Sequence, residues 1–75
     1  MLNIYDFEVS RYADGSSIMS YYGENTGDMY HIHIDVTSYV VDVETLDENG
    51  EAKEGPRFIA SSLSSAIATI EEQES

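Results

Sequence analysis

Two histidines and an aspartate form the pattern in this sequence that most resembles a metal-ligand set. His31, His33 and Asp35 alternate with isoleucines, so on a strand all three side chains point to the same face. Two histidines at this spacing can share a metal ion, and a carboxylate can supply a third ligand. The sequence indicates no fourth ligand or base beside them. The pattern therefore favours a polar strand face over a metal centre, and we expect no metal and no cofactor.

Carboxylates dominate the chemistry of the chain. Fifteen Asp and Glu residues face three Lys and Arg residues among 75, which gives a net charge of -12. Direct binding to nucleic acid or to anionic lipid is disfavoured, because both require basic patches on the protein. The charge favours a basic partner, and we expect that partner to be a cationic surface on another protein.

Familiar catalytic motifs are missing from the sequence. It contains no nucleophile elbow, P-loop, HExxH or GxGxxG, and no spacing that assembles a Ser–His–Asp triad. It contains no cysteine, which excludes disulfides and a thiol nucleophile and is typical of cytosolic proteins. Neither a signal peptide nor an apolar run of about 20 residues is present. These features predict a cytoplasmic protein that is not an enzyme.

Short strands and one helix must position the acidic residues. Asp14-Gly15 and Asn49-Gly50 are typical of tight hairpin turns. The spacing of Leu63, Ala66, Ile67 and Ile70 predicts a helix over about 62–73, with Ser61 or Ser62 as its N-cap. Alternating apolar and polar residues predict β structure at 2–12, 17–22, 28–46 and 51–60.

Residues 28–46 leave two interpretations open. The apolar positions are even-numbered through Ile34 and odd-numbered from Tyr39 onward. A β-bulge near Thr37-Ser38 would keep one bent strand in register, whereas a two-residue turn there would make two strands. Thr-Ser lacks the Gly or Asn that such a turn prefers, which favours the bulge. Pro56 cannot donate to a ladder, so residues 51–60 should form an edge strand or begin properly at Arg57.

These elements predict one α+β domain over residues 1–75. Its antiparallel meander has four strands, or five if residues 28–46 turn, and extends over about 2–60. The C-terminal helix packs its apolar stripe on one sheet face and leaves the other face wet. Same-face side chains about 6.6 Å apart on strands about 4.8 Å apart would form a dense anionic surface, or simply a solvated one. Alternation places on this face Asp6, Glu8, His31, His33, Asp35, Asp42 and Glu44.

The predicted helix ends in an unfavourable place for its charges. Glu71, Glu72 and Glu74 crowd its C-terminus, where the helix dipole disfavours negative charge. We expect either that this end frays or that the charge serves another purpose.

Acidic runs on a small sheet-and-helix chain suggest a type of inhibitor. Phe7-Glu8-Val9, His33-Ile34-Asp35 and Asp42-Val43-Glu44, in a short chain without cysteine, resemble in character the small phage-encoded inhibitors of host defence, including anti-CRISPR proteins and nucleic-acid mimics. The resemblance implies a protein that enters the host cytoplasm, occupies a basic nucleic-acid-binding channel of a host protein and blocks it. We expect the partner-binding residues to be Asp6, Glu8, Asp35, Asp42, Glu44, Asp47, Glu48, Tyr21 and Tyr22.

Two other interpretations of the acidic surface remain. The protein could be a non-catalytic structural or assembly module, with homodimers formed through a sheet edge or exposed tyrosines and a charge that only confers solubility. A halophilic source would also explain a generic acidic surface. Whether the chain is a monomer or a homodimer is left open by the sequence.

Overall fold

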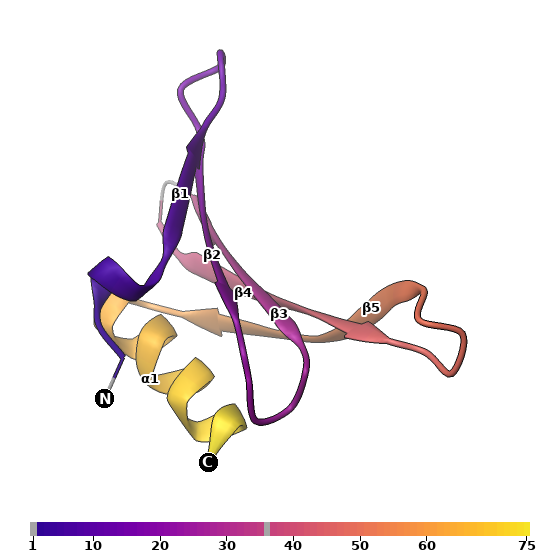
Figure 1. The fold of residues 1–75 in the computed structure, drawn as a ribbon. Coiled ribbons are helices and arrows are strands. Elements are labelled where there is room, and N and C mark those ends of the chain that lie inside the picture. The colour runs from indigo at the N-terminus through magenta and orange to yellow at the C-terminus, as the bar shows by residue number, and fades with distance from the viewer. Residues whose placement is uncertain (1, 36) are drawn as a thin grey trace.

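Five antiparallel strands lie in the sheet in the same order as in the chain, which confirms the predicted meander in its five-stranded form (Figure 1). A computed structural model describes residues 2–35 and 37–75. One C-terminal helix packs on one side of the sheet, as predicted. The elements are the 3-10 helix η1 (Ile4–Asp6), β1 (Glu8–Arg11), β2 (Ser17–Tyr22), β3 (Met29–Ile34), β4 (Tyr39–Leu46), β5 (Ala52–Ala60) and α1 (Leu63–Glu74).

A turn divides residues 28–46 into β3 and β4, so the favoured bulge near Thr37-Ser38 is wrong. The amide of Asp35 donates to the carbonyl of Ser38 at 2.9 Å, and Ile34 pairs with Tyr39. Each even residue of β3 pairs with an odd residue of β4. The change of parity in the apolar pattern therefore comes from reversal of the chain, not from a slip within one strand.

The bulge occurs in β5 instead. Asp42 pairs with Arg57 and Glu44 pairs with Glu54, so Gly55 and Pro56 together oppose one residue of β4. A Cβ on Gly55 would lie 2.8 Å from the carbonyl oxygen of Val43, which explains glycine at this position. β5 is an edge strand, as Pro56 predicts, and it continues through the proline because the bulge absorbs the lost donor.

The predicted first strand is too long. Residues up to Asp6 form η1, where the Asn3 side chain accepts from the Tyr5 amide at 2.8 Å and the Asp6 carboxylate accepts from the Asn3 amide at 2.9 Å. These local hydrogen bonds compete with strand pairing and hold the segment in a turn. Tyr5 is consequently 93% exposed, and pairing in β1 begins only at Glu8.

The helix buries the stripe that its spacing predicts. Ser62 is the N-cap and accepts from the Ser65 amide at 3.1 Å. No helix among the described residues is long and apolar enough to cross a membrane. The core lies between α1 and one sheet face, and its most buried side chains are Tyr30, Ile32, Val41 and Ile70.

The helix does not fray at Glu74, contrary to one of the two expectations for this end. Its carboxylate accepts from the Tyr30 hydroxyl at 2.7 Å, from the Asn25 amide at 3.0 Å and from the Thr26 hydroxyl. Burial alone would raise the pKa of the Glu74 carboxyl, but these hydrogen bonds outweigh it and lower the pKa. Gly23 makes the approach possible, because a Cβ there would collide with the carboxylate.

Candidate functional site on the open sheet face

One side of the sheet, here called the open face, is not covered by any described helix. α1 packs on the opposite side, which is the side that carries the core (Figure 1). Strand alternation and the observed pairing decide which side chains point to the open face. They are Glu8 and Ser10 of β1, Ile18, Ser20 and Tyr22 of β2, Met29, His31 and His33 of β3, Val40, Asp42, Glu44 and Leu46 of β4, and Ala52, Glu54, Arg57 and Ile59 of β5.

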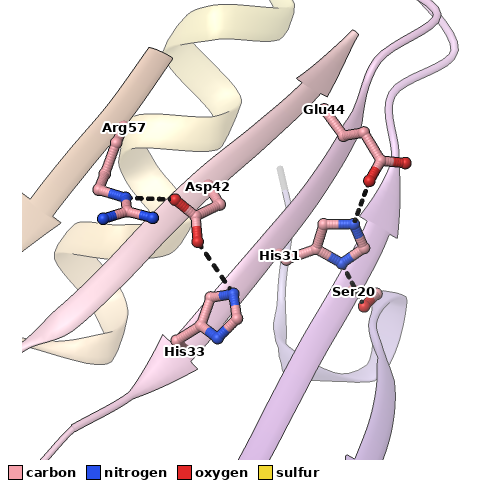
Figure 2. Close-up of polar contacts among 6 residues, drawn as sticks. All are labelled: Ser20, His31, His33, Asp42, Glu44 and Arg57. Atoms are coloured by element: carbon pink, nitrogen blue, oxygen red, sulfur yellow. Dashed lines mark hydrogen bonds and ion pairs between the residues drawn. The ribbon is translucent and has the colours of Figure 1, made fainter. Parts of the chain in front are cut away.

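Diagonal pairs connect the two histidines to carboxylates on β4. His33 Nε2 lies 3.0 Å from Asp42 Oδ2, and His31 Nε2 lies 3.9 Å from Glu44 Oε2 (Figure 2). In each pair the carboxylate is two residues beyond the histidine's direct partner on β4. The histidines of the H-x-H row on β3 therefore lie beside the D-x-E row on β4, and the His31 ring also contacts Ser20 of β2.

Arg57 binds the other side of Asp42. Its Nε donates to Asp42 Oδ1 at 2.6 Å, so one carboxylate contacts both Arg57 and His33 (Figure 2). The hydrogen bond to Asp42, followed by the charge of Asp42, raises the pKa of the Arg57 guanidinium. Arg57 is an exposed residue, and exposed ion pairs contribute little to stability. The pair therefore matters chiefly because it reduces the negative charge of the open face.

Two carboxylates on the open face lie directly opposite each other on neighbouring strands. Glu44 and Glu54 are direct partners across β4 and β5. Like charges in opposed positions on neighbouring strands destabilise a sheet, because their Cβ atoms are only about 5 Å apart. This arrangement is unfavourable for the free protein and favourable for holding a cation from outside.

A shallow depression of about 750 Å³ opens over this part of the face. Strand register places exposed apolar side chains on the same face, outside its lining, among them Tyr22, Leu46 and Ile59, which is 74% exposed. Charged groups beside exposed aromatic and aliphatic groups are typical of protein-binding surfaces. The titratable residues that line the depression are His31, His33, Asp42, Glu44, Lys53, Glu54 and Arg57.

The structure brings four of the nine expected partner-binding residues to the open face: Glu8, Tyr22, Asp42 and Glu44. The other five lie elsewhere. Asp6 caps η1, Asp35 lies in the β3–β4 turn, and Tyr21 packs on the core side with its ring centroid 5.5 Å from that of Phe7. Asp47 and Glu48 lie in the β4–β5 turn, where Asp47 Oδ1 accepts from the Asn49 and Glu51 amides at 2.9 Å each.

Sequence reasoning missed Ser20, Glu54 and Arg57 as members of the open face. Ser20 Oγ is hydrogen-bonded to His31 Nδ1 at 2.9 Å, and Arg57 is hydrogen-bonded to Asp42. The bulge after Glu54 brings Glu54 and Arg57 to the same face of the sheet, which simple alternation along a strand cannot do. The lone Pro56 was the available signal for that bulge.

Ser20, His31 and Glu44 lie in a row that superficially resembles a hydrolytic triad. The histidine–glutamate separation of 3.9 Å exceeds a hydrogen bond. β2 is paired on both sides, so its amides are engaged in the ladders and cannot stabilise an oxyanion beside Ser20. Among residues 2–35 and 37–75, no three His, Asp or Glu side chains are grouped to hold a metal ion.

A second acidic depression of about 500 Å³ lies at the C-terminal end of α1. It is lined by Asp6, Glu24, Glu71 and Glu74 from three separate segments, together with Tyr21. Burial, and then the charges of Glu74, Asp6 and Glu24, raise the pKa of the Tyr21 hydroxyl. Glu74 already serves to attach the helix, so this depression has a structural explanation that the open face lacks.

The open face thus combines uncovered apolar area, a surplus of carboxylates and two histidines. Its chemistry is suited to contact with a cationic surface. No family model, curated protein or solved structure that we compared matches this chain.

Proposed function

We propose that the protein binds a basic, nucleic-acid-binding surface of another protein through its open face and blocks that surface. The observation that supports this most strongly is the direct opposition of Glu44 and Glu54 beside exposed apolar side chains. A sheet selected for stability alone would place a Lys or Arg directly opposite one of these acids. A docked lysine or arginine would relieve their repulsion.

Charge complementarity identifies the class of partner. The open face carries the carboxylates of Glu8, Asp42, Glu44 and Glu54, in a chain whose net charge is -12. Grooves that bind DNA or RNA present closely spaced Lys and Arg side chains to release counterions. An acidic sheet can occupy such a groove in place of the phosphates, and electrostatic attraction makes the encounter fast and salt-dependent.

Apolar contacts supply the part of the affinity that salt does not remove. Ile59 is 74% exposed and Tyr22 is 54% exposed. Burying side chains of this size contributes roughly 1.5–3 kcal/mol each when the burial is complete. The proposed partner therefore presents an apolar or aromatic surface next to its basic residues.

The proposed setting is the cytoplasm, and the host cytoplasm if the protein is phage-encoded. The mode of action is steric and not enzymatic, as for the anti-CRISPR proteins and nucleic-acid mimics that the sequence resembles in character. We propose no direct contact with nucleic acid or with membranes, because the chain has only three basic residues.

Competition with oligonucleotides tests the proposal. A panel of purified basic DNA- and RNA-binding proteins is loaded with labelled oligonucleotide at low salt, and displacement by the wild-type chain is measured. We expect displacement from at least one member, and loss of it when Glu8→Gln, Asp42→Asn, Glu44→Gln and Glu54→Gln are combined. The matched control combines Glu24→Gln, Glu51→Gln, Glu71→Gln and Glu72→Gln, which removes the same charge away from the open face.

Equal loss of displacement in both quadruple variants would show that net charge acts without the open face. Absence of displacement from every panel member at low salt would reject a blocking function.

A second candidate is a structural module that forms homodimers. The favouring observation is that β5 is a nine-residue edge strand with exposed Ile59. The net charge of -12 opposes self-association, so this candidate requires dimers that strengthen as salt is added. Light scattering across a salt series distinguishes it: a salt-stabilised dimer that displaces no oligonucleotide favours the module.

A further inference from the structure

We propose that His31 and His33 make docking on the open face pH-dependent, with basic partners bound at neutral pH and released on mild acidification. This inference rests on the proposed function and adds its regulation. Histidine is the only side chain whose charge ordinarily changes between about pH 5 and 8. Both histidines of the chain lie on the open face, inside the depression proposed to receive cations.

His33 faces a carboxylate that already holds a cation. From β4 it faces Asp42, 3.0 Å away, and the same carboxylate is hydrogen-bonded to Arg57 of β5. From β2 it faces Ile18, which has no charge. Its own strand leads into Asp35 in the β3–β4 turn. A proton on His33 therefore gives Asp42 two cationic neighbours and leaves little negative charge for a partner.

His31 faces the opposed acids. On β2 its Nδ1 is hydrogen-bonded to Ser20, and beyond Ser20 lies Glu8 of β1. On β4 it is directly opposite Asp42, and its Nε2 lies 3.9 Å from Glu44. The remaining charged groups at this end of the depression are Lys53 and Glu54 of β5. A proton on His31 places a cation beside Glu44, where the partner's cation would bind.

The charge of the face changes substantially between the two states. With both imidazoles neutral, the four outward carboxylates of Glu8, Asp42, Glu44 and Glu54 exceed the Arg57 guanidinium and the Lys53 ammonium, which also lines the depression, by two charges. With both imidazoles protonated, this excess is cancelled. The imidazolium groups and the partner's cations compete for the same oxygens, so binding of a basic partner must release protons.

A fluorescent nona-arginine peptide serves as a defined basic probe. Its dissociation constant is measured by anisotropy at about pH 8 and about pH 5.5, at constant low salt, where ordinary carboxylates remain ionised. We expect binding to the wild type to weaken about two- to tenfold at the lower pH, since two surface charge pairs change. The double variant with His31→Gln and His33→Gln should bind equally well at both pH values, whatever its affinity relative to the wild type.

A charge-fixing variant provides the converse test. His33→Lys carries a permanent cation beside Asp42, so it should bind weakly at both pH values and respond less to pH than the wild type. Calorimetry near pH 6.5 in two buffers of different ionisation enthalpy reports protons directly, and the wild type should release them on binding. Circular dichroism of each variant checks that the fold is retained.

The outcomes separate the inference from the function on which it rests. If nona-arginine fails to bind any version at about pH 8 and low salt, charge-driven docking itself is wrong. If it binds, and the pH response is equal in the wild type and the double glutamine variant, the histidines do not control docking and this inference is overturned.

Discussion

The hydroxyl of Tyr30 donates a hydrogen bond to the carboxylate of Glu74, 2.7 Å away, and thereby joins the middle strand of the sheet to the last turn of the helix. Tyr30 is almost wholly buried, at 1% exposure. Glu74 places a negative charge at the helix C-terminus, where the helix dipole disfavours it. The several hydrogen-bond donors around its carboxylate offset that unfavourable effect.

Glu74→Ala should destabilise the protein by about 1–3 kcal/mol, because it leaves the buried Tyr30 hydroxyl without its charged acceptor. Denaturant unfolding measures the difference. Glu72→Ala is the matched control on an exposed position of the same turn, and removing its charge should be neutral or slightly stabilising. Equal destabilisation by both changes would show that the helix end is held by something other than Glu74.

Stability should depend on pH through Glu74 and Tyr30. Because the pKa of Glu74 is lowered in the folded protein, its ionised carboxylate stabilises the fold at any pH above its pKa in the unfolded chain. This stabilisation is lost as the pH falls through its pKa in the folded protein. The difference in unfolding free energy between the wild type and Glu74→Gln should therefore shrink in acid. A pH-independent difference from about pH 6 to 3 would contradict this expectation.

At alkaline pH, stability should be lost as the pH rises and not as it falls. Burial raises the pKa of Tyr30 to about 12, so the unfolded state loses this proton first. Stability should fall as pH rises from about 10 toward 12. Tyr30→Phe should remove the titration step near pH 12 from the ultraviolet absorbance curve. Persistence of that step in the variant would assign it to another tyrosine.

Gly23→Ala should cost stability only while Glu74 is in place. The added Cβ would lie 2.6 Å from Glu74 Oε1 and would force the carboxylate away from its donors. A double-mutant cycle with Glu74→Ala should give a coupling energy of about 0.5–3 kcal/mol. Additive effects would mean that alanine at position 23 acts on the loop itself.

Glu54→Lys should stabilise the free protein and weaken its docking. The new ammonium faces Glu44 across the ladder, and an opposite-charge pair contributes roughly 0.2–1 kcal/mol. Unfolding and nona-arginine binding are measured on the same sample. Glu48→Lys, at the tip of the β4–β5 turn, is the control with the same charge change. Similar losses of binding in both variants would argue against the open face as the docking surface.

Arg57→Gln should strengthen docking, because it frees Asp42 from its internal cation. The effect should be greatest at low salt and should disappear when Asp42→Asn is combined with it. Weaker binding in the single variant would show that the arginine itself contacts the partner.

The fold was largely accessible from the sequence because its signals are local. Alternation, Asp-Gly and Asn-Gly turns and the stripe ending at Ile70 place most elements and the single uncovered face. Residues 2–7 were assigned incorrectly because side-chain hydrogen bonds at Asn3 and Asp6, invisible to periodicity, favour a turn over a strand.

The candidate site was less accessible because it depends on register. The pairing of Asp42 with Arg57 and of Glu44 with Glu54 follows from a bulge that no spacing rule positions. Likewise, the role of Glu74 depends on contacts with residues more than forty positions earlier in the chain. Such relationships arise only when the sheet and the helix are assembled.

The bulge at Gly55 and Pro56 also has a consequence for the protein in concentrated solution. Long, apolar edge strands are templates on which other chains add strands and grow into aggregates. In β5 the proline removes an amide donor and the bulge interrupts the regular spacing of the outer backbone groups. A second copy could pair with the regular segments on either side of the bulge, but it would find no continuous nine-residue ladder to extend. The irregularity that positions Glu54 and Arg57 thus also protects the chain from fibril growth along its longest free edge.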